Sequence, residues 1–165
     1  MSLLRKIQSL PLITKFMLNH YAPYRGARIE VDELDYANNH IRVKMPLTRK
    51  NRNVVGVHFG GSLYSMVDPF FMLLLMHHLG PKYIVWDKDA SISFLSPGRG
   101  TVYADIRIAV NEVKTIIELA ADHSPVYRNY TVDIYDDSGA RIAEVHKTVY
   151  IRRKKPKALF KGKAR

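Results

Sequence analysis

Residues 51–69 of this 165-residue sequence hold the residue types that acyl-transfer chemistry needs. Gly60 and Gly61 stand at the start of a helical pattern, where backbone N–H groups have no intrahelical acceptor and can polarise a carbonyl oxygen. Asp68 follows Gly61 by seven residues, about two helical turns, so its carboxylate falls on nearly the same helix face. The spacing therefore predicts an oxyanion hole and a carboxylate that serve one substrate.

The Asp68 carboxylate is expected to be a general base or a nucleophile. The apolar residues 70–76 follow it, so partial desolvation should raise its pKa. Pro69 removes one helical hydrogen bond and is expected to kink the helix beside the acid. Two plainer interpretations stay open: Gly60-Gly61 as a simple turn, and Asp68-Pro69 as an ordinary helix start that replaces one long helix with two short ones.

Several other kinds of site are not expected. The sequence has no cysteine, which excludes disulfides, cysteine-ligated metals and a thiol nucleophile. The adjacent His77 and His78 would diverge by about 100° on a helix, and Asp87 and Asp89 lack the rest of a calcium loop, so no metal is predicted. Phosphate-binding loops, dinucleotide fingerprints and serine nucleophile elbows are missing from the sequence.

The elements that must position these residues can be read from hydrophobic periodicity. A helix is predicted over residues 61–79, ending at Gly80-Pro81, and its second half is apolar on all sides. Period-two alternation and turn residues predict strands at 28–36, 41–47, 83–95, 102–110, 126–135 and 140–152. A loop is expected over 48–58 and a helical or irregular connection over 111–123. The pattern indicates an α+β hot-dog fold, with an antiparallel β-sheet wrapped around one long central helix.

The domain organisation follows from length and charge. The chain is long enough for one core, with an N-terminal helical lead-in at 1–20 that is weakened at Pro11, and a hot-dog domain at 21–152. A basic, flexible tail is expected at 153–165. Of the net charge of +11, eight positive charges lie between Arg152 and Arg165, which leaves an ordinary body of +3. Nucleic-acid binding is therefore not favoured, although the tail leaves nucleic-acid or anionic-membrane binding as a third hypothesis.

The sequence also bears on location. Its longest apolar run, residues 70–76, is far shorter than the roughly 20 residues of a membrane span, and no signal-peptide pattern is evident. We therefore expect a cytoplasmic protein without an integral membrane segment.

The motif around Asp68 resembles that of a known enzyme group. The order Asn, Gly, (His)-Gly-Gly and then Asp after six residues resembles the signature of hot-dog acyl-CoA thioesterases of the phenylacetate-pathway type. The string from Phe59 to Pro69 resembles more closely an uncharacterised family of proposed hot-dog thioesterases. The resemblance covers residues 20–152, and its specific part is 51–68. This sequence departs from the motif because Phe59 occupies the usual histidine position and His58 lies one residue earlier.

The resemblance implies an acyl-CoA thioesterase in which Asp68, Gly61 and Asn53 are catalytic. It also implies a homodimer or homotetramer, with each site built across the subunit interface. The substrate would be an acyl-CoA or acyl-carrier thioester, so coenzyme A is part of the substrate and no separate cofactor is expected. The expected substrate-binding residues are His58, Phe59, Gly60, Tyr64, Phe71, Met72, Arg49, Lys50 and Arg52.

Each group of these residues has an expected contact. Phe71 and Met72 would line an apolar acyl tunnel, and the three basic residues, or the tail, would meet the phosphates. The alternative function is a non-catalytic hot-dog protein that binds acyl-CoA or fatty-acyl groups. Dehydration is less favoured, because the central helix has no glutamate and Asp68 is its only acid.

Overall fold

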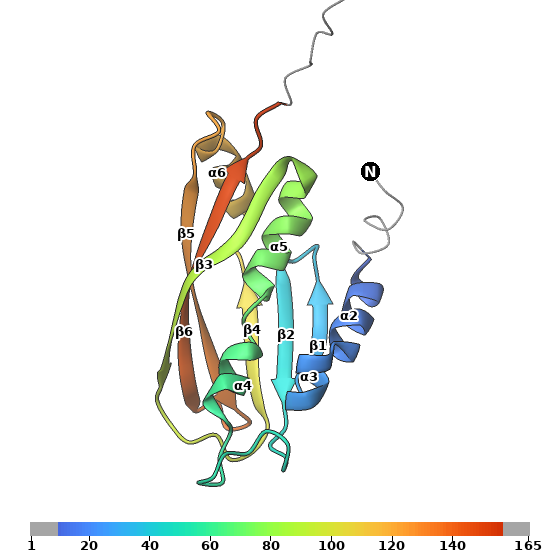
Figure 1. Ribbon diagram of the computed structural model, residues 1–165, viewed down its shortest axis with the longest axis vertical. Helices are drawn as coiled ribbons and strands as arrows, with labels where there is room; N and C mark the ends of the chain where they lie inside the picture. Colours follow the sequence, from blue (N-terminus) through green and yellow to red (C-terminus); the bar gives the residue numbers. More distant parts are fainter. Residues whose placement is uncertain (1–9, 157–165) are drawn as a thin grey trace, which may run out of the picture.

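A computed structural model describes residues 10–156 of the chain. Its strands are β1 (Glu30–Asp35), β2 (His40–Met45), β3 (Tyr83–Phe94), β4 (Val102–Arg107), β5 (Val126–Asp136) and β6 (Arg141–Arg153). Its helices are α2 (Pro11–His20), α3 (Ala22–Ala27), α4 (Gly60–Ser65), α5 (Phe70–Leu79), the 3-10 turn η1 (Gly80–Lys82) and α6 (Glu112–Leu119). The strands form one antiparallel sheet in the order β1-β2-β4-β5-β6-β3 (Figure 1).

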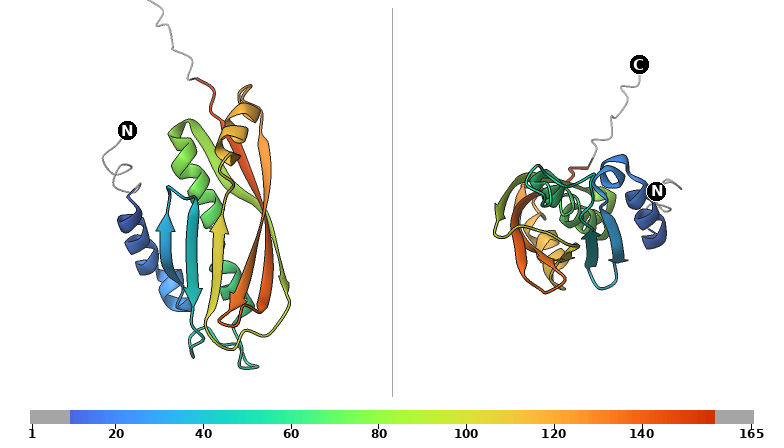
Figure 2. Two further views of the ribbon diagram at one scale, coloured as in Figure 1. Left: turned by 180° about the vertical axis from the view of Figure 1, so that it is seen from behind. Right: turned by 90° about the horizontal axis from the view of Figure 1, so that it is seen from below.

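The sheet curls around the central helical segment, as the end-on view of Figure 2 shows. Alternate residues of the strands face this segment, so Val102, Ala104 and Ile106 of β4 are completely buried. The helix contributes Phe70 and Leu74, which are also completely buried, to the same core. The predicted α+β hot-dog fold, with its six strands and the helical connection at 111–123, is confirmed.

The central helix is interrupted beside the candidate acid. Helix α4 ends at Ser65, residues 66–69 form a turn, and α5 begins at Phe70. Pro69 is the N-cap of α5, and its carbonyl accepts a hydrogen bond from the Leu73 N–H at 2.9 Å. The predicted central helix is therefore present but divided into two short helices, because Pro69 has no N–H to continue the helical ladder. Pro69, and not Asp68 as the alternative interpretation had it, is the N-cap of α5.

One face of α5 is open rather than enclosed. Met76 is 48% exposed, whereas Leu75 beside it is completely buried. The helix therefore lies in the concave face of the sheet with half of its residues buried, so the prediction that it is buried on most sides holds only in part.

The two edges of the sheet differ. Helix α2 lies along β1 (Figure 1), and the Asn19 side chain both donates to the Val31 carbonyl at 3.2 Å and accepts from the Val31 N–H at 2.7 Å. Helix α2 begins at Pro11, which agrees with the expected weak point of the lead-in, because a proline costs no hydrogen bond in the first turn of a helix but cannot continue one. The opposite edge, β3, pairs only with β6 in the part of the chain that the structure describes. The remainder of the N-terminal lead-in, residues 1–9, and the tail from residue 157 lie outside the described residues.

Strand β3 contains a bulge at Lys88. Asp87 and Asp89 lie opposite consecutive residues of β6, so Lys88 is an extra residue in β3. The alternation of inward-facing and outward-facing side chains therefore shifts by one residue at Lys88. Asp87 faces inward before the bulge, whereas Ala90 and Ile92 share the inward register after it. The bulge thus adds a carboxylate to a strand face that is otherwise apolar.

Candidate active site

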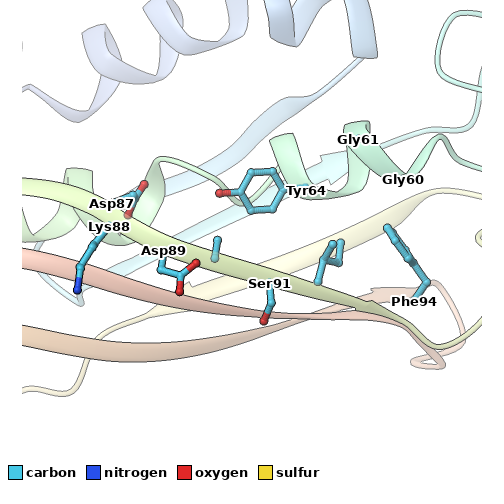
Figure 3. Close-up of a pocket in the computed structure, with 10 residues that line it drawn as sticks. Gly60, Gly61, Tyr64, Asp87, Lys88, Asp89, Ser91 and Phe94 are labelled. Atoms are coloured by element: carbon cyan, nitrogen blue, oxygen red, sulfur yellow. The ribbon is translucent and has the colours of Figure 1, made fainter.

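A cleft of about 570 Å³ lies between the start of α4 and the edge strand β3 (Figure 3). Its walls are Gly60, Gly61, Tyr64, Asp87, Lys88, Asp89, Ala90, Ser91, Ile92 and Phe94. The helix contributes backbone and one phenol, and the strand contributes two carboxylates. Figure 3 shows the Tyr64 hydroxyl pointing along the cleft toward Asp87.

The two glycines at the head of the cleft have free N–H groups and close aromatic neighbours. Ser62 and Leu63 donate to the Phe59 carbonyl, whereas the N–H groups of Gly60 and Gly61 have no acceptor within residues 10–156. A Cβ added at Gly60 would lie 2.8 Å from the Phe94 ring, and one at Gly61 would lie 2.5 Å from the Phe59 ring. A larger residue at either position would have to displace one of these exposed rings, whereas glycine lets both rings lie against the backbone beside the two N–H donors.

Asp68 is held by a buried lysine and by the cleft tyrosine. Its Oδ1 accepts a hydrogen bond from the Tyr64 hydroxyl at 2.6 Å and one from Lys147 Nζ at 2.8 Å. Lys147 also donates to the Asp68 carbonyl at 2.7 Å, so the lysine fixes both the backbone and the side chain of the turn. The Lys147 side chain is fully buried, whereas that of Asp68 is 45% exposed. The carboxylate therefore has fixed partners and an open side.

The same lysine binds a second carboxylate. Lys147 Nζ lies 2.9 Å from Asp87 Oδ2 on β3. Asp87 Oδ1 is buried and has no hydrogen-bond partner among the described residues. One ammonium group thus joins two carboxylates: Asp87, which lines the cleft from the strand side, and Asp68, which lies in the turn after α4 and is not among the lining residues.

The two carboxylates have pKa values shifted in opposite directions. Burial raises the pKa of Asp68, but the hydrogen bonds from Lys147 and Tyr64 outweigh it, so this pKa lies below the ordinary value. For Asp87, burial raises the pKa and the nearby Asp68 charge adds to the rise, while Lys147 offsets it only in part. The predicted rise in the Asp68 pKa is therefore wrong, because the sequence did not show its partners.

Comparisons with known proteins place the chain in a family. Residues 11–151 match the model of the family named "Domain of unknown function (DUF4442)". The chain belongs to the DUF4442 family. No curated protein sequence matches it.

Solved structures similar to this DUF4442 protein share its fold. PA5026 of Pseudomonas aeruginosa, a protein of unknown function named as a probable thioesterase, has a TM-score of 0.76 at 15% identity, covering 87% of this chain and 95% of its own. Thioesterase HI1161 of Haemophilus influenzae has a TM-score of 0.64 at 16% identity, covering 90% and 94%. OLEI01261 of Chlorobaculum tepidum, of unknown function, has a TM-score of 0.70 at 15% identity, covering 87% and 97%. At these identities, the likeness shows the fold alone.

Lys147 and Asp87 are site residues of the DUF4442 chain that sequence reasoning missed. The signal for the lysine was present, because His146, Thr148 and Tyr150 occupy the outer face of β6 and leave Lys147 on the inner, apolar face. Asp87 was considered only as a fragment of a calcium loop, and its inward direction depends on the bulge at Lys88.

Two of the predicted residues shape the loop before α4. The Asn53 Oδ1 accepts hydrogen bonds from the N–H groups of Val55 and Val57, at 3.1 and 3.2 Å. His58 is 3% exposed, and its Nε2 lies 2.9 Å from the Gly100 carbonyl. Burial lowers the pKa of His58, in keeping with a neutral ring. Neither side chain lines the cleft beside Gly61.

The remaining predicted contacts are dispersed. Phe71 is 1% exposed and stacks on Tyr130 with ring centroids 4.6 Å apart, so it belongs to the core, and Met72 is half-buried on α5. Of Arg49, Lys50 and Arg52, only Lys50 lines a second cleft, of about 330 Å³, which also holds Arg25 and Arg28.

From the sequence, we expected neither a metal site nor a membrane-spanning helix. Residues 10–156 contain no cluster of three or more histidine or acidic side chains that could hold a metal ion. Within the same residues, no helix combines the length and the hydropathy needed to cross a membrane.

Proposed function

We propose that this protein hydrolyses acyl thioesters of the acyl-CoA type. The observation that carries the proposal is an ionised carboxylate, Asp68, hydrogen-bonded to a tyrosine in the wall of a cleft whose other end presents two free N–H groups. The likeness in fold to proteins named as thioesterases supports the same reaction.

Each part of the cleft has a role in the proposed reaction. The N–H groups of Gly61 and Gly60 would polarise the thioester carbonyl and stabilise the oxyanion of the tetrahedral intermediate. Asp68, kept ionised by Lys147 and Tyr64, would accept a proton from the attacking water. Phe59 and Phe94, 56% and 58% exposed, would cover the acyl group beside the glycines.

The phosphates of the substrate would bind in the second cleft. Arg25, Arg28 and Lys50 line it, and these three cations form no ion pair with any described residue. The buried Asn51 connects the two clefts: its Nδ2 donates to the Ala27 carbonyl at 2.7 Å, and its own carbonyl accepts from the Phe59 N–H at 2.8 Å. We infer that a pantetheine arm spans the distance between them.

We also propose that the working form is a homodimer that forms through β3. This strand of 12 residues is the uncovered edge of the sheet and lines the candidate cleft. Unpaired edge strands readily pair with another strand, and a second copy of β3 offers a complementary one. Such pairing would place the partner subunit beside each cleft.

The first prediction concerns Asp68. Asp68→Asn is expected to lower kcat/KM for acyl-CoA hydrolysis by about 100-fold or more, because the amide cannot accept a proton from water. The measurement is thiol release from a panel of acyl-CoAs of increasing chain length, with Asp133→Asn on the outer face of β5 as the matched control.

Two outcomes would count against this assignment. Equal rates for the wild type and Asp68→Asn would remove Asp68 from the mechanism. Saturable binding of acyl-CoA without turnover at any chain length would instead favour the alternative, a non-catalytic acyl-binding protein.

A further inference from the structure

The loop between β2 and α4 ends in a hairpin tip, residues 52–58, that carries two uncovered apolar side chains. Val54 is fully exposed and Val55 is 72% exposed. They are the central residues of a β-turn, which is closed by a hydrogen bond from the Gly56 N–H to the Asn53 carbonyl at 3.0 Å. Glycine, proline, asparagine, aspartate and serine dominate such turns, so the turn itself does not explain two exposed valines.

The tip is ordered by hydrogen bonds of its backbone. The Asn53 N–H donates to the Val57 carbonyl at 2.8 Å, and Arg52 and His58 form a β-bridge behind the turn. The His58 N–H also donates to the Gly98 carbonyl at 3.1 Å, which joins the tip to the loop after β3. The two valines therefore project from a fixed hairpin instead of packing on the protein.

Further apolar side chains are exposed at the same end of the molecule. Figure 1 shows the tip and the loop after β3 together at the lower end. Phe59, Phe94 and Leu95, beside these loops, are between 49% and 58% exposed. The rings of Phe59 and Phe94 lie against Gly61 and Gly60 of the candidate cleft. Exposed apolar side chains thus lie both on the tip and at the glycine end of the cleft.

Positive charge accompanies these apolar side chains. Segments 46–59 and 95–101 contain no acidic residue and four cations, which are Arg49, Lys50, Arg52 and Arg99. All four are exposed, and within residues 10–156 none of them forms an ion pair. The turn after β5, beside Gly100, adds Asp136 and Asp137, so the cations outnumber the acids at this end. A second copy of the tip would present the same positive charges, which favours an anionic partner instead.

We propose that the hairpin tip binds the surface of an anionic lipid membrane. The valines would enter the apolar boundary below the headgroups, and the cations would lie among the negatively charged headgroups. A projecting tip suits a lipid surface, which yields to it, whereas a folded protein partner would need a complementary groove. This binding does not depend on the proposed thioesterase function, although a fatty-acyl substrate leaving a membrane would reach the cleft from the same end.

The direct test uses the absence of cysteine from the chain. Val54→Cys, and Val110→Cys as its matched control, each provide one attachment site for an environment-sensitive fluorophore. Val110 is 88% exposed and precedes α6, which lies at the opposite end of the molecule (Figure 1).

The probe at position 54 is expected to respond to anionic membranes alone. Vesicles of phosphatidylcholine with about 30% phosphatidylserine should raise its emission by about twofold or more and shift it to shorter wavelength, because the dye enters an apolar layer. The probe at position 110 should not change, and vesicles of phosphatidylcholine alone should affect neither probe.

Three outcomes would overturn the proposal. Vesicle binding without a response at position 54 would assign the binding to another basic part of the chain, such as the tail from residue 157. A response of both probes would mean that binding is not specific to the tip. Absence of binding to anionic vesicles would leave the tip to a protein partner.

Co-sedimentation with the same vesicles measures the contributions of charge and of apolar contact. Arg49→Gln with Arg52→Gln is expected to lower the partition coefficient by about 25-fold, since each cation near an anionic surface contributes about fivefold. Val54→Ser with Val55→Ser should lower it by about tenfold. Arg107→Gln with Lys114→Gln, both exposed, is the matched control for charge.

The valine variant also separates this proposal from the proposed function. Without vesicles, it should hydrolyse acyl-CoA at the wild-type rate, because neither valine lines the candidate cleft. Unchanged vesicle binding by this variant would overturn the proposed membrane site whatever the rate of hydrolysis. Absence of hydrolysis by the wild type would overturn the proposed function and leave the vesicle result standing.

Discussion

At the scale of single residues, Lys147 connects the parts of the site. It contacts Tyr64 of α4 at 3.2 Å, the turn at Asp68 and Asp87 of β3, although it lies on β6. Its pKa is raised, because the hydrogen bonds from its side chain to Asp68 and Asp87 outweigh the lowering caused by burial. A fully buried ammonium is costly unless such partners are present, so the lysine and its two acids stabilise the fold only as a set.

We therefore predict that Lys147→Met destabilises the protein by on the order of 3 kcal/mol, because it leaves two carboxylates beside an apolar side chain. The triple variant with Asp68→Asn and Asp87→Asn should recover part of this loss, since no uncompensated charge remains. Urea unfolding of both variants at neutral pH measures the difference. If the triple variant is no more stable than Lys147→Met, the unpaired acids are not the cause of the lost stability.

Sequence reasoning reached half of this residue-scale chemistry. Asp68 and Gly61 were identified, because they are separated by a motif that is local in sequence. Lys147 lies 79 residues from Asp68, and only the alternation of β6 could indicate that it faces inward. The direction of the Asp68 pKa shift could not be predicted without that lysine, because burial alone acts in the opposite direction.

At the scale of elements, α3, the loop after β2 and the start of α4 form a connected unit. Asn51 is 2% exposed, and besides its bond to α3 its Nδ2 donates to the Pro46 carbonyl at 2.9 Å. These hydrogen bonds hold the loop in place, so Lys50 lies beside Arg25 and Arg28. This grouping brings together basic residues that are 22 to 25 positions apart in the chain.

If this cleft binds phosphate groups, the double variant Arg25→Gln, Arg28→Gln is expected to raise KM for an acyl-CoA by roughly tenfold. Each charge-assisted hydrogen bond contributes about 1 kcal/mol or more. The same variant should leave KM unchanged for a matching acyl-pantetheine, which lacks the phosphates. Arg107→Gln, on exposed β4 surface, is the control. A parallel rise for both substrates would mean that the arginines act on the fold rather than on phosphate.

The strands were more predictable than the breaks within elements. Alternation gave all six strands, because one face of each strand is buried against the helix. The interruption at residues 66–69, the helix start at Pro11 and the bulge at Lys88 each depend on a local backbone choice that tertiary packing selects. The predicted boundaries of the lead-in, domain and tail stay predictions.

At the scale of the whole molecule, the two sheet edges determine how copies can meet. The Asn19 side chain of α2 forms hydrogen bonds with the backbone of β1 at the outer edge of the sheet. Among the described residues, no helix or strand covers the outer edge of β3 in this way. Association through β3 would extend the sheet and shield the exposed rings of Trp86 and Phe94 near that edge.

The oligomeric state provides the last prediction. The wild type is expected to have twice the 19.0 kDa chain mass in light scattering. Ser91→Lys with Ser93→Lys should shift it toward the single-chain mass, because like charges would face each other across paired strands. The same substitutions at Ser124 and Ser138, in exposed turns, are the control. A dimer that survives the β3 variant would assign the interface to another surface.

Because of the bulge at Lys88, the number of residues in β3 is more constrained than their types. Deleting one residue between Asp87 and Ala90 would restore regular alternation, and either the acid or the apolar residues beyond it would then have to face solvent. Substitutions on the exposed side leave this parity intact. We therefore expect β3 to tolerate substitutions on its exposed side better than an insertion or a deletion within the strand.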